Sequence, residues 1–241
     1  ASSIVACGDL FNTIFGMNKT IAMVGATCII LIYTFLGGFN AVCWTDFFQG
    51  MLMLAALMAA PIVAVFAMNA ADFAPMAAVV TPDNYYNLLS SGKLDWASIS
   101  DILSGLGWGL GYFGMPHILV RYMSIKSEKE MKKSRVIGIT WTAIILAMAS
   151  VVALVGHQFA GEYLVANGMK ESMIFVVMVR KLFPAFIAGL LLSAILAASM
   201  STADSQLLLS TSAFTSDVYK PVFRKKASNK EILWAGRIMV A

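Results

Sequence analysis

Residues 191–212, LLSAILAASMSTADSQLLLSTS, form an apolar segment as long as a bilayer-crossing helix, which needs about 20 residues. The middle of this segment nevertheless carries hydroxyl groups, an amide and a carboxylate, on Ser193, Ser199, Ser201, Thr202, Asp204, Ser205 and Gln206. An ionisable group at mid-membrane costs at least ~2.5 kcal/mol on insertion scales and usually faces a cavity or an ion. The segment therefore predicts a transmembrane helix with a polar function.

The composition of the whole chain also indicates a membrane protein. Of its 241 residues, 59% are hydrophobic and 12% are charged, with a mean hydropathy of +0.79, whereas soluble domains carry about 25% charged residues. We expect an all-α, multi-pass membrane protein with one transmembrane domain over residues 1–241. Its predicted spans lie at roughly 20–37, 43–68, 101–121, 136–157 and 182–212. Since the chain starts without Met and both ends are apolar, we expect an internal fragment of a longer protein.

The charges of the connecting loops predict the orientation of the spans. Loops 121–135 and 217–231 are rich in Lys and Arg, whereas 69–100 carries Lys93 alone against three aspartates. Because basic loops stay in the cytoplasm, 69–100 is predicted to be an extracellular loop. Membrane topology accounts for the basic residues, so we expect the lipid bilayer, and no nucleic acid, as their partner.

One helical face of the fifth span suggests a cation site. Ala198, Ser201, Thr202 and Ser205 have the spacing i, i+3, i+4, i+7 and therefore lie on one face. The Ala198 carbonyl and two hydroxyls would supply half of an oxygen cage for a hard cation such as Na⁺. Alternatively, the hydroxyls bond back to carbonyls of the preceding turn and permit close helix packing.

Two further motifs carry chemistry. Asp46 follows the pair Gly37 and Gly38 at the cytoplasmic start of the second span. It is either a cation ligand on an exit path or an acid that offsets the helix dipole.

In the third span several glycines precede Pro116, which predicts a broken helix lining a cavity. Trp108 and Tyr112 would form an aromatic wall there for a small substrate. The alternative is a glycine seam that admits a neighbouring helix.

Three stretches together resemble the sodium/solute symporter family, and above all its sodium/proline symporters. They are YTFLGGFNAVCWTDFFQG (33–50), GWGLGYFGMPHILVRYMS (107–124) and LLSAILAASMSTADSQLL (191–208), followed by TSDVYK (215–220). The resemblance implies a LeuT-like fold of two inverted repeats, with this fragment running from the end of core helix three to the start of core helix nine. It also implies a protein of the cell membrane that imports L-proline by alternating access, with Na⁺ as coupling ion and no other cofactor.

The resemblance also implies roles for individual residues. Ala198, Ser201 and Thr202 correspond to half of the main sodium site, and Asp46 to the inward sodium path. A further sodium is implied between Asp46 and the pair Asp204 and Ser205. The implied substrate site comprises Trp108, Tyr112, Pro116 and Met115, the last standing where proline carriers commonly have Gln.

Other functions stay open at this stage. The same mechanism would serve another amino acid, pantothenate, a sugar or an organic acid, and a related membrane module would serve as a sensor. Two membrane aspartates also suggest an aspartyl protease, which needs paired carboxylates. Neither acid lies in a Gly-x-Gly-Asp stretch, so we expect no enzyme.

Overall fold

The computed structural model describes residues 2–69, 87, 89, 92–112 and 114–240, and these residues form helices and connections without strands. The elements are α1 (Ser2–Phe15), α2 (Lys19–Met68), α3 (Trp96–Tyr112), α4 (Pro116–Met123), α5 (Glu128–Ala166), η1 (Glu171–Met173), α6 (Ile174–Leu182), α7 (Ala185–Ala213), the π-helical η2 (Phe214–Phe223) and α8 (Asn229–Val240). The predicted all-α architecture is confirmed. Most of the predicted extracellular loop 69–100 lies outside the described residues.

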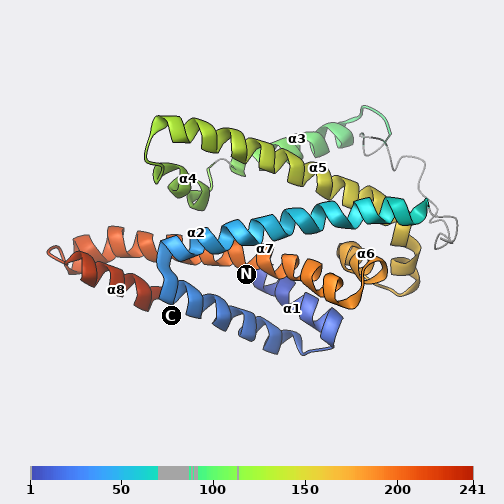
Figure 1. The fold of residues 1–241 in the computed structure, drawn as a ribbon. Helices are drawn as coiled ribbons and strands as arrows, with labels where there is room; N and C mark the ends of the chain where they lie inside the picture. The colour runs from blue at the N-terminus through green and yellow to red at the C-terminus, as the bar shows by residue number, and fades with distance from the viewer. Residues whose placement is uncertain (1, 70–86, 88, 90–91, 113, 241) are drawn as a thin grey trace.

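Helix α2 contains two membrane-length segments. Its 50 residues would extend about 75 Å as a straight helix, more than twice the hydrocarbon thickness of a bilayer. Figure 1 shows that the helix instead doubles back, with α7 between its two halves. A Cβ atom at Gly37 would overlap with the Cβ of Ala41, so the bend requires a glycine there. The predicted break at Gly37 is thus a sharp bend within continuous helix.

Among the described residues, four helical stretches are long and apolar enough to cross a membrane: Lys19–Gly37, Ala41–Asn69, Glu128–Ala166 and Ala185–Phe223. They overlap the first, second, fourth and fifth predicted segments. The third, 101–121, differs because it is divided: α3 ends at Tyr112, and α4 begins at Pro116 after an extended Met115. Proline lacks an N–H and fits the first turn of a helix, so it marks the new start. The predicted broken helix is confirmed.

The fourth and fifth helices extend beyond their predicted apolar cores. Helix α5 begins at Glu128, where the Ser127 hydroxyl accepts a hydrogen bond from the Glu130 N–H at 3.3 Å. Residues 128–135 of the predicted basic loop therefore form the first turns of α5. Helix α7 follows Pro184 and continues directly into η2. The helical segment therefore ends at Phe223, beyond the predicted end at residue 212.

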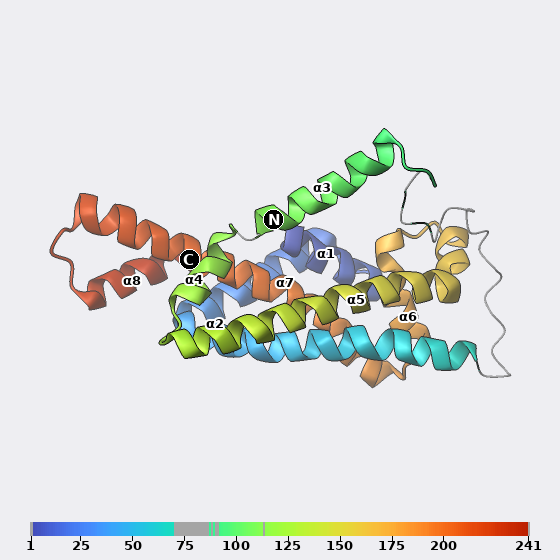
Figure 2. The same cartoon turned by 90° about the horizontal axis from the view of Figure 1, so that it is seen from above.

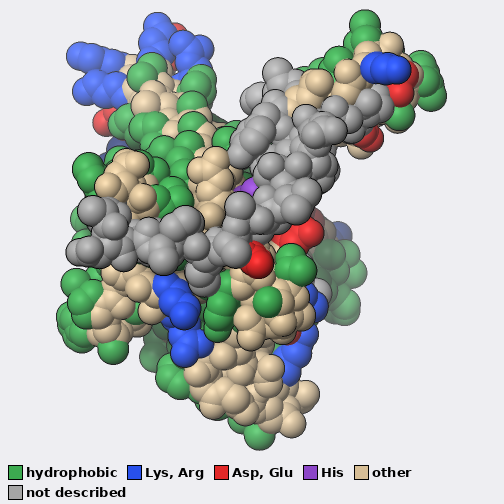
Figure 3. All heavy atoms as spheres, turned by 90° about the vertical axis from the view of Figure 1, so that its right-hand side faces the viewer, with side chains coloured by type: hydrophobic (Ala, Val, Ile, Leu, Met, Phe, Trp, Pro, Cys, Tyr) green, Lys and Arg blue, Asp and Glu red, His purple; other side chains and the backbone are tan. Residues whose placement is uncertain are grey.

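Helix α7 lies at the centre of the molecule. It packs against α1, α2 and α6, and towards its C-terminal end it also packs against α4 and α8. On α2, Ala56, Ala60 and Ala64 are buried at four-residue intervals, and such small side chains let helices approach closely. Figure 3 views the molecule from the end at which α2 finishes, where charged groups are gathered in a few places among hydrophobic and other side chains. Along the long helices, large apolar side chains such as Phe66 and Leu146 are exposed, and such a surface suits contact with lipid.

Helix α3 lies apart from this packed centre. Among the described residues, no other helix packs extensively against α3. Figure 2 shows α3 extending away from the bundle. A Cβ atom at Gly105, Gly107, Gly109 or Gly111 would meet nothing within 4 Å. Nothing in the described part of the chain therefore packs on these glycines as the alternative of a packing seam would require.

Candidate functional site

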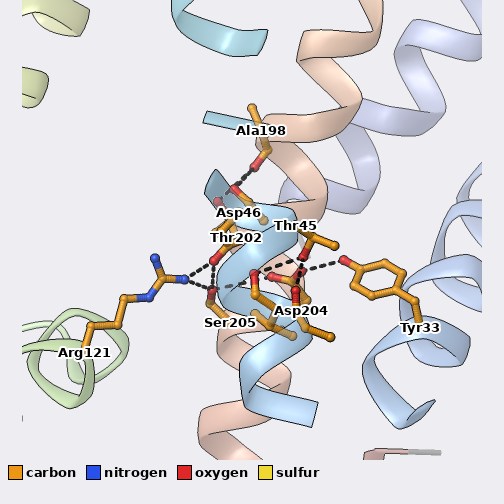
Figure 4. A network of polar contacts seen from close by, with 11 residues as sticks. Tyr33, Thr45, Asp46, Arg121, Ala198, Thr202, Asp204 and Ser205 are labelled. Atoms are coloured by element: carbon orange, nitrogen blue, oxygen red, sulfur yellow. Dashed lines mark hydrogen bonds and ion pairs between the residues drawn. The ribbon is translucent and has the colours of Figure 1, made fainter. Parts of the chain in front are cut away.

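A buried carboxylate joins α7 to the first half of α2. The side chain of Asp204 is fully buried, with 0% exposure, and its Oδ2 accepts a hydrogen bond from the Tyr33 hydroxyl at 2.6 Å. Next to it, the Ser205 hydroxyl lies 3.5 Å from Asp204 Oδ1 and 3.3 Å from Asp46 Oδ2. Ser205 thus connects two carboxylates that come from different helices (Figure 4).

An arginine from α4 completes this group. Arg121 Nη2 donates a hydrogen bond to Ser205 Oγ at 2.6 Å and forms an ion pair with Asp46 Oδ2. Figure 4 shows Arg121 and Tyr33 reaching the group from opposite sides. We call Tyr33, Asp46, Arg121, Asp204 and Ser205 the carboxylate cluster. Its two carboxylates and one guanidinium leave a formal charge of −1.

Some polar atoms at the cluster lack hydrogen-bond partners within the described part of the chain. Asp46 Oδ1 is buried without a partner, and so is the hydroxyl of Thr34, the neighbour of Tyr33. Ser205 has one hydroxyl proton and can donate to only one of its two carboxylates. An unsatisfied buried polar atom costs about 1–3 kcal/mol. Oxygen atoms without donors, together with the net negative charge, are the surroundings in which a hard cation binds.

The predicted main sodium ligands lie on the same helix. Ser201 Oγ and Thr202 Oγ1 donate hydrogen bonds to the Ala198 carbonyl at 3.3 and 3.1 Å. This is the geometry expected from back-bonding alone. It also gathers three oxygens at one place, and each hydroxyl keeps lone pairs for a cation. The structure is therefore compatible with both interpretations of these hydroxyls.

The depth of the carboxylate cluster follows from its neighbours. Trp44, two residues before Asp46, is 65% exposed, and aromatic residues of this kind mark the membrane–water interface. Under the predicted orientation this is the cytoplasmic end of the span. Along α7, Ser205 lies about 10 Å beyond Ala198 in the cytoplasmic direction. Under the predicted orientation, the cluster therefore lies between the Ala198 group and the cytoplasm.

The predicted substrate residues surround the break between α3 and α4. Tyr112 is the last residue of α3, Met115 is the extended residue before α4, and Pro116 opens α4. The backbone of Trp108 belongs to α3, whereas its side chain lies outside the described residues. The break is linked to the carboxylate cluster through α4, which carries Arg121. The substrate role of these four residues stays a prediction.

Sequence reasoning missed two members of the cluster. Arg121 was counted only as a charge that sets topology, and Tyr33 was one residue of an apolar span. An intramembrane acid implies a partner, but Tyr33 and Asp204 are separated by 171 residues. No local signal identifies such a pair.

Comparison with known proteins places the chain among transporters. The family model described as "Sodium:solute symporter family" matches residues 1–241. The chain is 41% identical to the osmoregulated proline transporter OpuE of Bacillus subtilis and 40% identical to the sodium/proline symporter of Escherichia coli. Each match includes 100% of this chain and, respectively, 48% and 47% of the relative. The chain thus spans about half the length of the curated relatives that it matches.

A solved structure has the same fold. A Na⁺-coupled sialic acid symporter in a substrate-bound outward-open state matches with a TM-score of 0.71 at 19% sequence identity. The match includes 98% of this chain and 51% of that chain. This similarity confirms the predicted fold class, a LeuT-like transporter fold.

Proposed function

Because this chain belongs to the sodium:solute symporter family, we propose that the complete protein is a sodium-coupled secondary transporter that imports L-proline by alternating access. Relatives named as proline transporters are 40–42% identical over the whole chain, which supports both the ion and the substrate. The observation that carries the proposal is the carboxylate cluster, a group of net charge −1 at the junction of apolar helices. Its Asp204 side chain is fully buried, and Asp46 Oδ1 has no hydrogen-bond partner in the described part of the chain.

In this mechanism α7 supplies oxygen ligands to sodium. The Ala198 carbonyl and the hydroxyls of Ser201 and Thr202 bind the ion on one side, and segments of the complete protein outside this chain supply the rest. L-proline binds at the break between α3 and α4. Sodium and proline stabilise the same conformer, and each therefore raises the affinity for the other by the same factor. Asp46 lies on the path along which sodium leaves.

We propose no catalytic reaction. In aspartyl proteases two carboxyl groups share a proton directly at about 3 Å. Here the contacts between Asp46 and Asp204 run through Ser205, at 3.3 and 3.5 Å, and Arg121 forms an ion pair with Asp46. This arrangement suits two separate anionic ligands rather than a proton-sharing pair. A carrier of another small solute, or a sensory module, is the less favoured alternative.

The test is uptake of radiolabelled L-proline by the complete protein in proteoliposomes, with and without an inward sodium gradient. We expect uptake only with the gradient. Trp108→Ala should raise the proline concentration for half-maximal uptake at saturating sodium. The control is Trp44→Ala, which removes a tryptophan that is 65% exposed. If proline is not carried but sodium raises the melting temperature, the cargo is a different solute. If sodium changes neither uptake nor melting temperature, the proposal is wrong.

A further inference from the structure

The two helices beside the break are loosely attached to the rest of the described chain. Helix α3 has no principal packing partner there, and the principal partner of α4 is α7. Among the described side chains of α4, Arg121 makes polar contacts with two other helices, through Asp46 on α2 and Ser205 on α7. Its guanidinium group therefore links α4 directly to the packed centre.

Arg121 also occupies the exit from the predicted ion site. Ser205 lies one turn beyond Ser201 and Thr202 along α7, on the side that faces the cytoplasm under the predicted orientation. A cation that leaves the Ala198 group in that direction must pass the two oxygens that Arg121 now contacts. The guanidinium blocks this position sterically and also repels a second cation at short range.

The contact has the properties of a reversible closure. The Asp46 side chain is 9% exposed, whereas the Arg121 side chain is 46% exposed, and under the predicted orientation it approaches from the cytoplasmic end of the spans. An arginine can release its partners into water without leaving its own charge buried. A single nitrogen, Nη2, makes both contacts, so one displacement of the side chain breaks them together.

We propose that Arg121 is a gating residue, whose contacts with Asp46 and Ser205 close the cytoplasmic exit of the sodium site and must open before sodium leaves. This inference rests on the proposed sodium-coupled transport and adds the group that prevents sodium from escaping without substrate. Loss of the contact opens the exit permanently and uncouples sodium movement from proline.

The experiment measures radioactive sodium flux through the complete protein in proteoliposomes without proline. Arg121→Gln should raise this flux about tenfold, equivalent to a loss of about 1.4 kcal/mol from the closed state. Arg121→Lys keeps the charge without the planar guanidinium group and should raise the flux about threefold. The control is Arg135→Gln, which removes an exposed arginine of the same basic region and should leave the flux unchanged.

A second readout separates gating from a structural role. The sodium-induced rise in melting temperature should persist in Arg121→Gln, because the Ala198 group is intact. An unchanged proline-independent flux in a variant that sodium still stabilises would overturn the gate. Should Arg121→Gln fail to fold, Arg121→Lys decides, and a wild-type flux in that variant overturns the gate as well. If the wild-type protein itself shows no sodium-dependent uptake or stabilisation, the proposed function fails first, and the gate fails with it.

Discussion

The hydrogen bond between Tyr33 and Asp204 allows the sharpest test of the carboxylate cluster. The bond is 2.6 Å long and ends on a carboxylate with 0% exposure, whose other side-chain partner, Ser205, lies 3.5 Å away. Hydrogen bonds to charged groups contribute about 1.5–3 kcal/mol. Tyr33→Phe keeps the ring and removes only the donor, so we expect the folded state to lose about that amount.

The assay is thermal unfolding of the complete protein in detergent, followed by fluorescence, with and without sodium. For 150–250 residues, 1 kcal/mol corresponds to about 2–4 °C, and this shift becomes smaller in longer chains. Because the relatives are about twice as long as this chain, a fall in melting temperature of at least ~1.5 °C is expected for the complete protein. Tyr163→Phe is the matched control. Its hydroxyl forms no hydrogen bond within the described part of the chain, and the Lys181 ammonium, 4.8 Å from the ring centroid, can contact phenylalanine equally.

A double-mutant cycle identifies the partner of Tyr33. If the hydroxyl acts through Asp204, the effect of Tyr33→Phe should shrink by at least ~1 kcal/mol when Asp204→Asn is already present. Equal melting temperatures for Tyr33→Phe and Tyr163→Phe would refute the reasoning. An effect of Tyr33→Phe that is the same in both backgrounds would show that the hydroxyl stabilises something other than the carboxylate.

Three further outcomes are expected. Ser201→Ala and Thr202→Ala should each raise the sodium concentration for half-maximal uptake about tenfold or more with little change in maximal rate, as sodium titrations of uptake would show. Asp46→Asn should slow uptake more than Asp46→Glu does, whereas equal, near-normal rates would leave only a helix-dipole role. The hydrogen bond from Arg224 holds the pKa of Glu231 below its ordinary value. The ion pair therefore contributes its full stability to α8 at pH values above that ordinary pKa, and this contribution is lost as the pH falls through the lower folded-state pKa. Glu231→Gln removes the titrating group. Between pH 5 and 3, the melting temperature of this variant should therefore change less than that of the wild type.

Local signals in the sequence were sufficient for the helices but not for their contacts. Hydropathy predicts the long spans because a bilayer demands apolar length, and the Gly and Pro residues around Pro116 predict the break because each weakens a helix. The bend at Gly37 was predicted as a break, since sequence does not show that helical hydrogen bonds continue through it. The contacts of Arg121 with Ser205, 84 residues away, depend on how whole helices pack. Long-range pairs of this kind have no signature in a single sequence.

The charge of the carboxylate cluster connects the sodium site with the gate. Two buried carboxylates need positive partners, because an uncompensated charge in a low-dielectric environment is strongly destabilising. With Arg121 in contact with Asp46 and Ser205 the cluster keeps a formal charge of −1, which attracts a monovalent cation held at the Ala198 group nearby. Asp204→Asn makes the cluster neutral with Arg121 alone, and we expect it to weaken sodium binding even though Ala198, Ser201 and Thr202 remain in place.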